Sequence, residues 1–330
     1  MRYIDHGRGG PPSCLHLARG PQPVPRYGEV LIEVAYAGIN RPDILQRTGQ
    51  YPPPEDASPI LGLEVSGHII AAGPGAESWT PGTPVTALVP GGGYAEYCVT
   101  PSGQVLPVPH GMDLAAAAAL PETWFTVWAN LVDLAGLSRD EYLLVHGGAS
   151  GIGLAALALG HLRGARCLAV AGSDEKAAFC REWGAELAIN RHTTDFVQAV
   201  FDATRGEGVD VILDIAGAPY FDRNLKLLRR DGRLVFLAFM GGSQGMVDLA
   251  PIMRKRLHLT GSTMRPRTVP EKRAIRDALL AHVWPELAHG RFHPHIHARF
   301  PLQEAASAHM LMETGNHIGK IVLEVAPTHA

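Results

Sequence analysis

The segment from Tyr142 to Ala156 reads YLLVHGGASGIGLAA and determines the fold of the chain around it. It begins as a short apolar strand, passes through a glycine-rich turn and continues into an alanine-rich stretch that favours a helix. Gly151, Gly153 and Ala156 match the G-x-G-x-x-G/A pattern of dinucleotide-binding turns. Such glycines let backbone N–H groups approach a pyrophosphate at the positive end of a helix, and Ala156 allows close helix–strand packing. We therefore expect a dinucleotide to contact Ser150, Gly151 and Ile152.

The residues after the next strand indicate which dinucleotide is bound. NAD sites place an Asp or Glu about 20 residues beyond the glycine turn, where it binds the ribose 2′-OH. Here the strand ends at Gly172 and Ser173, and Lys176 follows one helical turn later, which favours the 2′-phosphate of NADPH. Asp174 is the competing signal for NADH, although an acid is also expected in a first helical turn behind a Ser N-cap. Arg191, after the following strand, adds charge or stacks on adenine.

Two kinds of segment follow one another along the chain. From about residue 113 to residue 263, apolar strands alternate with amphipathic helices, which indicates a parallel sheet covered on both faces. Before it, short strand-like runs between Gly and Pro breakers indicate a small β-barrel. After a predicted helix at 271–289, the runs HIHARFP and IGKIVLEV are expected to rejoin that barrel. We predict an α/β plus β fold, with a barrel domain at 1–121 and 264–330 and a Rossmann domain at 122–263.

Composition excludes several other classes of protein. The 330 residues are 46% apolar and 18% charged with a net charge of −3, so neither disorder nor a broad nucleic-acid-binding surface is expected. The apolar stretches are too short or interrupted for a membrane span, and the first residues lack the apolar core of a signal peptide. Four scattered cysteines without a CxxC pair fit a reduced, cytoplasmic protein and argue against a cysteine-rich zinc site.

The motif GGASGIG is shared by two classes of dehydrogenase. Short-chain enzymes place it near the N-terminus and need a Tyr-x-x-x-Lys pair as catalytic acid. No tyrosine in this chain has a lysine four residues later, and the motif begins at residue 147, behind a whole β-rich region. The short-chain class is therefore disfavoured.

The arrangement as a whole resembles the medium-chain dehydrogenase/reductase superfamily, in which a Rossmann domain is inserted before the last strands of a GroES-like catalytic domain. The resemblance runs almost end to end through GEVLIEVAYAGINRPDILQRTGQYPPP, ILGLEVSG, GGYAEY, HGGASGIG, AGSDEK and GNHIGKIVLEV. Through PETWFTVW, LAFMGG and HIGKIVLE the chain is most similar to the zinc-free quinone oxidoreductase branch, and there to the tumour-suppressor-inducible quinone oxidoreductases. Members often have Tyr where this chain has Arg191, so adenine packing is expected to differ here.

The positions of the family's zinc ligands carry other residues in this chain. Zinc alcohol dehydrogenases have a Cys in the segment that matches AYAGIN and a Gly-His-Glu motif, whereas this chain reads AGIN at 37–40 and has Leu63 in place of the histidine. The four-cysteine lobe of those enzymes is absent at 89–94. Because a catalytic zinc needs three protein ligands, the resemblance implies an enzyme without zinc, in which Glu64 is a hydrogen-bonding structural carboxylate.

This resemblance implies NADPH-dependent reduction of quinones or related activated carbonyls. A quinone suits catalysis without a metal, because its reduced anion is intrinsically stabilised. Asn40 and Tyr51 are implied to be the catalytic residues: the Tyr51 hydroxyl donates to the substrate oxygen, and Asn40 positions the substrate or the nicotinamide ribose. The residues alone leave another explanation open, with Asn40 as a turn residue before Arg41-Pro42 and Tyr51 as a loop anchor before three prolines.

Further residues are implied to border the cofactor. Thr126 matches a position near the nicotinamide, with a helix-packing threonine as the alternative. Ligands bind at the carboxyl ends of strands in such sheets, and a later segment is expected to close over the nicotinamide. These regions contribute Ala216, Phe239, Met240, Gly241, Met264 and Arg265. Lys320 stands in a turn typical of the family and is expected to be structural.

Two other functions stay open. One is an enoyl-thioester or enone double-bond reductase of the same superfamily, and the other is an NADPH-binding protein with an RNA-binding or structural role. The family implies a homodimer paired through the last Rossmann strand. His293, His295 and His297 alternate along the sequence, and a solvated strand explains them better than a metal site.

Overall fold

The computed structural model describes residues 1–325, and the chain divides into two compact units. Unit 1 is Met1–Phe125 with Arg265–Ala330, and unit 2 is Thr126–Met264. The predicted Rossmann domain begins at residue 122, four residues before unit 2. The second segment of the predicted barrel domain begins at residue 264, one residue before the second segment of unit 1. In the described part of the chain, no helix is both long and apolar enough to cross a membrane.

Unit 1 is built on a seven-stranded sheet with the order β14-β15-β3-β4-β5-β7, in which β6 also pairs with β3. The strands are β3 (Glu29–Ile39), β4 (Glu64–Ala72), β5 (Pro84–Leu88), β6 (Tyr97–Pro101), β7 (Val105–Pro107), β14 (Ile296–Pro301) and β15 (Lys320–Glu324). A separate two-stranded sheet consists of β1 (Arg2–Asp5) and β2 (His16–Arg19). Every pair in the seven-stranded sheet is antiparallel except β14 with β15.

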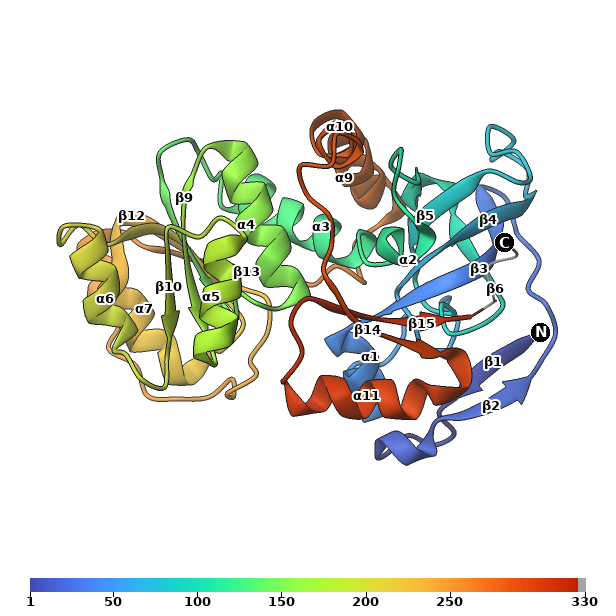
Figure 1. The fold of residues 1–330 in the computed structure, drawn as a ribbon, viewed down its shortest axis with the longest axis horizontal. Helices are drawn as coiled ribbons and strands as arrows, with labels where there is room; N and C mark the ends of the chain where they lie inside the picture. Colours follow the sequence, from blue (N-terminus) through green and yellow to red (C-terminus); the bar gives the residue numbers. More distant parts are fainter. Residues whose placement is uncertain (326–330) are drawn as a thin grey trace. The chain divides into compact units, whose positions relative to one another are not determined.

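The end of the chain completes the sheet that the first residues begin. β15 runs antiparallel to β3, with Ile321 opposite Ile39 (Figure 1). The predicted return of the C-terminal strands to the first domain is therefore confirmed. This register also brings Lys320, at the start of β15, to the end of β3, where Asn40 follows.

The helices of unit 1 lie between and after these strands. They are α1 (Arg41–Arg47), α2 (Leu114–Ala117), α3 (Pro121–Val127, which crosses the division), α9 (Val269–His282), α10 (Trp284–Ala288) and α11 (Ala305–Thr314), with 3₁₀ turns η1 (Pro12–Cys14), η2 (Ser102–Gln104) and η5 (Leu302–Glu304). The single helix predicted at 271–289 is α9 and α10, because Pro285 lacks the N–H needed to continue α9.

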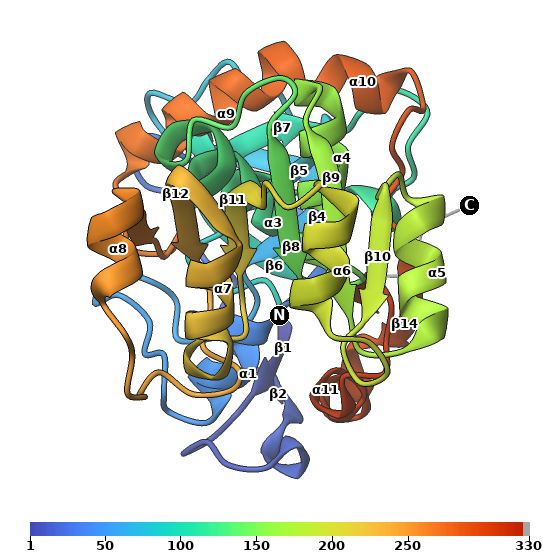
Figure 2. The same cartoon turned by 90° about the vertical axis from the view of Figure 1, so that its left-hand side faces the viewer.

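Unit 2 contains a six-stranded parallel sheet with the order β10-β9-β8-β11-β12-β13 (Figure 2). Its strands are β8 (Tyr142–His146), β9 (Arg166–Ala171), β10 (Leu187–Asn190), β11 (Val209–Asp214), β12 (Leu228–Phe236) and β13 (His258–Gly261). Its helices are the π-helical η3 (Trp128–Leu134), α4 (Gly151–Arg163), α5 (Asp174–Glu182), α6 (Phe196–Ala203), η4 (Ala218–Tyr220), α7 (Phe221–Leu227) and α8 (Ala250–Lys255). The predicted Rossmann fold is confirmed.

The strand order determines which helices cover each face of this sheet. The chain moves outward from β8 through β9 to β10 and then returns to β11 on the other side of β8. Because such crossovers are right-handed, α4 and α5 lie on one face and α6 and α7 on the other (Figure 1). The central strands β8, β9 and β11 are mostly buried and apolar because both faces are covered, whereas β12 and the edge strand β13 also carry polar, exposed residues.

Candidate active site

The turn after β8 positions the N-terminus of α4. Gly147 has a φ of 68°, which L side chains rarely adopt, so the chain reverses directly after the strand. Ser150 is the N-cap of α4, and its hydroxyl oxygen accepts a hydrogen bond from the Gly153 N–H at 3.0 Å. The first N–H groups of an α-helix have no partner within the helix, so those of Gly151 and Ile152 are available to an anion.

Only small residues allow this turn to pack as it does. A Cβ on Gly153 would overlap the carbonyl oxygens of Gly147 and Gly148, and a Cβ on Gly148 would lie 2.7 Å from the Ala169 side chain. Ala156, on α4, is completely buried. The helix therefore begins close against the strands, with its N-terminal backbone open to a ligand.

Two cations lie together at the carboxyl end of β9. A Cβ on Gly172 would lie 3.1 Å from Arg191 Nη1, so the guanidinium packs over the Gly172 backbone. Burial, and then the neighbouring Arg191 charge, lower the pKa of Lys176. Ser173 is the N-cap of α5 and accepts the Lys176 N–H at 3.2 Å. Gly172, Ser173, Lys176 and Arg191 thus form one positively charged site, which we call the cationic site.

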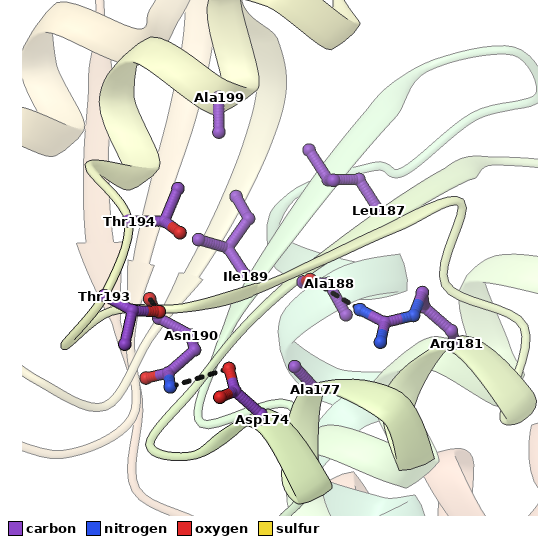
Figure 3. A pocket seen from close by; sticks show the side chains of 10 residues that line it. All are labelled: Asp174, Ala177, Arg181, Leu187, Ala188, Ile189, Asn190, Thr193, Thr194 and Ala199. Atoms are coloured by element: carbon purple, nitrogen blue, oxygen red, sulfur yellow. Dashed lines mark hydrogen bonds between the residues drawn. The ribbon is translucent and has the colours of Figure 1, made fainter.

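Asp174, the signal for NADH in the sequence, is hydrogen-bonded within the protein. Its Oδ1 accepts a hydrogen bond from Asn190 Nδ2 at 2.9 Å (Figure 3). Both side chains line a pocket of about 260 Å³ formed by α5, β10 and α6, whose lining includes neither Lys176 nor Arg191. This single hydrogen bond leaves further acceptor sites on the exposed Asp174 carboxylate.

The loops after β11 and β12 come together, as expected for residues that border a cofactor. The Met240 N–H donates to the Ile215 carbonyl at 3.0 Å, and the Gly241 N–H donates to the Ala216 carbonyl at 2.9 Å. Phe239 and Met240 are exposed. The structure therefore joins Ala216, Phe239, Met240 and Gly241 at the carboxyl edge of the sheet, where ligands of such folds bind.

Thr126 and Met264 stand at the two ends of unit 2. The Thr126 carbonyl accepts a hydrogen bond from Asn130 Nδ2 at 2.8 Å, and Asn130 Oδ1 accepts one from Ser262 Oγ at 3.0 Å. Met264 is buried. Asn130 thus links the segments that contain these two predicted cofactor residues.

The glycine turn and the cationic site together fit a dinucleotide with an extra phosphate on its adenosine ribose. The turn offers backbone donors and a helix N-terminus to a pyrophosphate. The cationic site offers an ammonium and a guanidinium, which suit a monoester phosphate.

A buried charged cluster joins three distant segments of unit 1. Lys320 Nζ lies 2.6 Å from Glu64 Oε1 and 2.6 Å from Asn40 Oδ1, and Asn40 Nδ2 donates to Glu64 Oε1 at 2.9 Å. All three side chains are buried. We call Asn40, Glu64 and Lys320 the Glu64 cluster. An ion pair this buried persists only when its remaining hydrogen-bonding groups are satisfied.

The neighbours of Glu64 complete its shell of partners. The Glu122 N–H donates to Glu64 Oε2 at 2.9 Å, so both carboxylate oxygens have donors. Gly38 supplies the space for this carboxylate, because a Cβ there would overlap the Glu64 side chain.

The residues at the family's zinc positions do not fit a zinc ion. Glu64 is engaged by Lys320 and Asn40, and Leu63 is an alkyl side chain that donates no electron pair. His297 and His317 form a ring contact at 6.4 Å, but no group of three or more His, Cys, Asp or Glu side chains within residues 1–325 is arranged to hold a metal.

Tyr51 lies against the side chain of Arg265. The Arg265 guanidinium lies 5.7 Å from the centre of the Tyr51 ring. It donates to Gln46 Oε1 at 2.8 Å and to the Pro90 carbonyl at 2.8 and 2.9 Å. The side chain of Arg265, predicted among the cofactor-binding residues, is thus buried in unit 1 with its donors bound to protein. That Arg265 borders the cofactor stays a prediction.

Lys320 and Glu122 both hydrogen-bond to Glu64. The pair with Glu64 agrees with the structural role expected for Lys320, whereas the contact of Glu122 is not predicted from the sequence. Charged residues at otherwise apolar positions, such as Lys320 before IVLEV, are the signal that was available.

A second buried network supports α1. Arg47 Nη1 donates a hydrogen bond to His309 Nδ1 at 3.1 Å, so Nδ1 is the acceptor and the imidazole proton is on Nε2. His309 Nε2 lies 3.1 Å from the Tyr94 hydroxyl oxygen, to which it donates. Tyr94 in turn donates to Asp43 Oδ2 at 3.1 Å. Burial raises the pKa of Asp43 to about 6, whereas burial and then the Arg47 charge lower the pKa of His309 to about 3.

Comparison with known proteins places the two units in known families. Residues 26–110 match the alcohol dehydrogenase GroES-like domain, and residues 151–279 match the zinc-binding dehydrogenase family. A mycocerosic acid synthase-like polyketide synthase of Mycolicibacterium smegmatis is 30% identical over 329 residues, which are 99% of this chain and 15% of that protein. The chain thus spans about 15% of the length of the curated relatives that it matches.

Several solved structures share the whole fold. An NAD-dependent alcohol dehydrogenase has a TM-score of 0.89 at 30% identity, over 99% of this chain and 100% of the other. The CurK enoyl reductase has a TM-score of 0.86 at 27% identity, over 98% and 99% of the two chains. The Escherichia coli quinone oxidoreductase in complex with NADPH has a TM-score of 0.84 at 25% identity, over 98% and 100%.

Proposed function

This chain belongs to the medium-chain dehydrogenase/reductase superfamily, and from that premise we propose that it is an NADPH-dependent quinone reductase that works without zinc. The observation that carries the proposal is the Glu64 cluster, because Lys320 and Asn40 engage the carboxylate that stands beside the family's ligand positions. Without a Lewis acid, the substrate must stabilise its own reduced anion, and quinones do so. The resemblance of the sequence to the quinone oxidoreductase branch supports the same class of substrate.

The cofactor is proposed to occupy the glycine turn and the cationic site. The N–H groups of Gly151 and Ile152 would hold the pyrophosphate, and Lys176 with Arg191 would hold the 2′-phosphate. The loops after β11 and β12, with Thr126 and Met264, would border the nicotinamide. Bound NADPH supplies a hydride. One solved relative is described as NAD-dependent and another as complexed with NADPH. The cations Lys176 and Arg191 at the end of β9 support NADPH.

Unit 1 is proposed to hold the quinone. The Tyr51 hydroxyl donates a hydrogen bond to the substrate oxygen that gains charge, while Arg265 fixes the Tyr51 ring. Asn40 is held by Glu64 and Lys320, so its carboxamide keeps one orientation toward the substrate or the ribose.

The cofactor assignment is tested by fluorescence titration with NADPH and NADH. Arg191→Ala and Lys176→Ala should each weaken NADPH binding by about 10- to 100-fold, because a hydrogen bond to a charged group contributes about 1.5–3 kcal/mol. NADH affinity should stay within about threefold. Arg166→Ala, which removes an exposed partner of Glu186, is the matched control in the same unit. Equal losses for both dinucleotides would contradict the proposed 2′-phosphate site.

The activity is tested by following NADPH oxidation with ortho- and para-quinones after dialysis against a chelator. Turnover should be unchanged by chelation and should not rise when zinc is added. Tyr51→Phe should lower kcat/KM by about 10-fold, as expected for the loss of one hydrogen bond in the transition state. Activity that appears only with zinc would overturn the proposal.

A second candidate is reduction of an enoyl thioester, with hydride addition to the carbon–carbon double bond. It is favoured by the structural likeness to the CurK enoyl reductase and by the polyketide synthase relatives. Crotonyl-CoA and longer enoyl-CoA substrates belong in the same assay. A kcat/KM for these thioesters above that for every quinone would select this function.

We further propose a cytoplasmic homodimer that pairs through β13. Among the described residues, this strand is at the edge of the unit 2 sheet and pairs with β12 only. Leu259 on β13 and Met253 on α8 are exposed. The four cysteines are all free thiols, which suits a reducing compartment. Light scattering should give twice the chain mass for the wild type and the single mass for Leu259→Glu.

A further inference from the structure

Three buried polar side chains join two neighbouring strands of unit 2 to a helix. His146 is the last residue of β8, Asp214 is the last residue of β11, and Asn224 lies on α7. His146 is 2% exposed, and Asp214 and Asn224 are completely buried. We call these three residues the His146 network. Because buried polar side chains need hydrogen-bond partners, the partners of the network show what it holds in place.

The hydrogen bonds between the three side chains run in one direction. Asn224 Nδ2 donates to Asp214 Oδ2 at 3.0 Å, so Asn224 Oδ1 is the atom that lies 2.8 Å from His146 Nε2. An amide oxygen can only accept, and the imidazole proton is therefore on Nε2. Burial lowers the pKa of His146, although the Asp214 charge acts in the opposite direction. The network is thus a neutral donor, an amide and a carboxylate in series.

Asp214 holds the turn that follows β11. Its Oδ1 accepts the Ala216 N–H at 2.5 Å and the Gly217 N–H at 3.2 Å. Gly217 has a φ of 82°, and the next N–H, of Ala218, donates to the Gly242 carbonyl at 2.9 Å. The carboxylate therefore fixes a turn that is also joined by hydrogen bonds to the loop after β12.

The other end of the network adjoins the glycine turn. His146 directly precedes Gly147, where the chain reverses. The Gly147 backbone packs against Ile215, because a Cβ on Gly147 would overlap the end of the Ile215 side chain. One continuous set of contacts thus joins the turn proposed for the pyrophosphate to the loops proposed for the nicotinamide.

We propose that His146, Asn224 and Asp214 are positioning residues for NADPH, which hold the loops after β11 and β12 in place relative to the glycine turn so that these loops receive the nicotinamide half of the cofactor. The inference rests on the placement of NADPH under the proposed function. The network acts on the cofactor through the backbone of Ala216 and Gly217. Its loss should therefore weaken the binding of the nicotinamide half and spare that of the two phosphate sites.

The test compares two ligands by titration calorimetry: NADPH, and 2′-phospho-ADP-ribose, which is the same molecule without its nicotinamide. The wild type should bind NADPH more tightly. His146→Leu removes the donor to Asn224 and should weaken NADPH binding by about 3- to 10-fold, as expected for one neutral hydrogen bond, with 2′-phospho-ADP-ribose within about twofold. His146→Gln should recover most of the loss, because the glutamine amide also donates.

Asp214→Asn is the second variant, since it keeps the shape of the side chain if His146→Leu does not fold. Its neutral amide oxygen holds the Ala216 and Gly217 N–H groups less strongly than a carboxylate does, so it should show the same selective loss of NADPH affinity.

Thr204→Val is the matched control for a general loss of stability. Thr204 is buried at the end of α6, where its hydroxyl donates to the Val200 carbonyl at 2.8 Å and accepts the Gly208 N–H at 3.0 Å. These bonds support the amino end of β11, opposite the His146 network. Thr204→Val should lower the free energy of unfolding, measured by chemical denaturation, and should leave the affinity for both ligands unchanged.

The outcomes separate the inference from the proposed function. Equal losses for the two ligands in His146→Leu and Asp214→Asn, or no loss for either ligand, overturn the inference. A wild type that binds 2′-phospho-ADP-ribose as tightly as NADPH overturns it too, because the loops then add nothing to the binding of the nicotinamide. A wild type that shows the expected selective losses but reduces no quinone supports the inference and overturns the proposed activity alone.

Discussion

The glycine turn of unit 2 and the Glu64 cluster of unit 1 are built by opposite means. Unit 2 uses backbone: glycines, a helix N-terminus and a Ser N-cap offer donors without a buried ion pair at the turn. Unit 1 uses side chains, because Glu64, Lys320 and Asn40 are buried together and satisfy one another. A backbone site depends on a short continuous segment, whereas a side-chain site depends on segments that meet only in the fold. The two sites should therefore fail differently when they are mutated.

The largest effect is expected where a buried charge loses its partner. Lys320→Met should reduce the free energy of unfolding by about 3–5 kcal/mol, because Glu64 is left buried and unpaired. The double variant Lys320→Met/Glu64→Gln should recover most of this loss, since it removes the charge as well. Arg2→Met breaks the partly exposed pair with Glu96 and should cost less than about 1 kcal/mol. Chemical denaturation measures all three. Equal losses of unfolding free energy in Lys320→Met and Arg2→Met would contradict the proposed difference between the buried and the exposed ion pair.

An intermediate effect is expected at the glycine turn. Gly153→Ala should weaken NADPH binding by about 10- to 100-fold. The new Cβ would overlap two carbonyl oxygens and displace the helix N-terminus, and such overpacking costs about 1–3 kcal/mol. Titration calorimetry measures the change. Gly245→Ala, whose Cβ would make an ordinary contact with Ala218, is the control. A Gly153→Ala variant that binds NADPH normally would show that the turn does not need its close backbone approach.

A third effect appears only in acid and concerns the stability of unit 1. Burial lowers the pKa of His309 to about 3. The unfolded chain therefore binds a proton at this side chain near pH 6.5, whereas the folded chain binds it only near pH 3. This contribution to stability is complete above about pH 6.5 and is lost as pH falls toward 3, by at most about 1.4 kcal/mol per pH unit. His309→Gln should be less stable at pH 7 but should lose less stability between pH 6 and 4. His110→Gln, at an exposed position, should keep the wild-type slope.

The same contrast explains how much the sequence could reveal. The strand, turn and helix from Tyr142 to Ala156 are local, and their expected structure is found at β8 and α4. By contrast, the contact between Lys320 on β15 and Asn40 after β3 spans 280 residues of sequence. The Arg265 contact with Gln46 spans 219 residues, and no pattern near Arg265 pointed to it. Side-chain partners at such separations follow from strand register and packing, which sequence patterns constrain weakly.

The sequence by itself determined the Rossmann unit, the glycine turn and the residues available to a 2′-phosphate, because each depends on local periodicity and on residues without large side chains. Only the tertiary structure decided that Asp174 binds Asn190, that Arg265 supports Tyr51, and that Lys320 completes a buried ion pair with Glu64. It also placed the buried Glu122 against Glu64 through a backbone hydrogen bond. The physical reason is that the charge state and hydrogen-bond partners of a buried group are set by neighbours from every part of the chain.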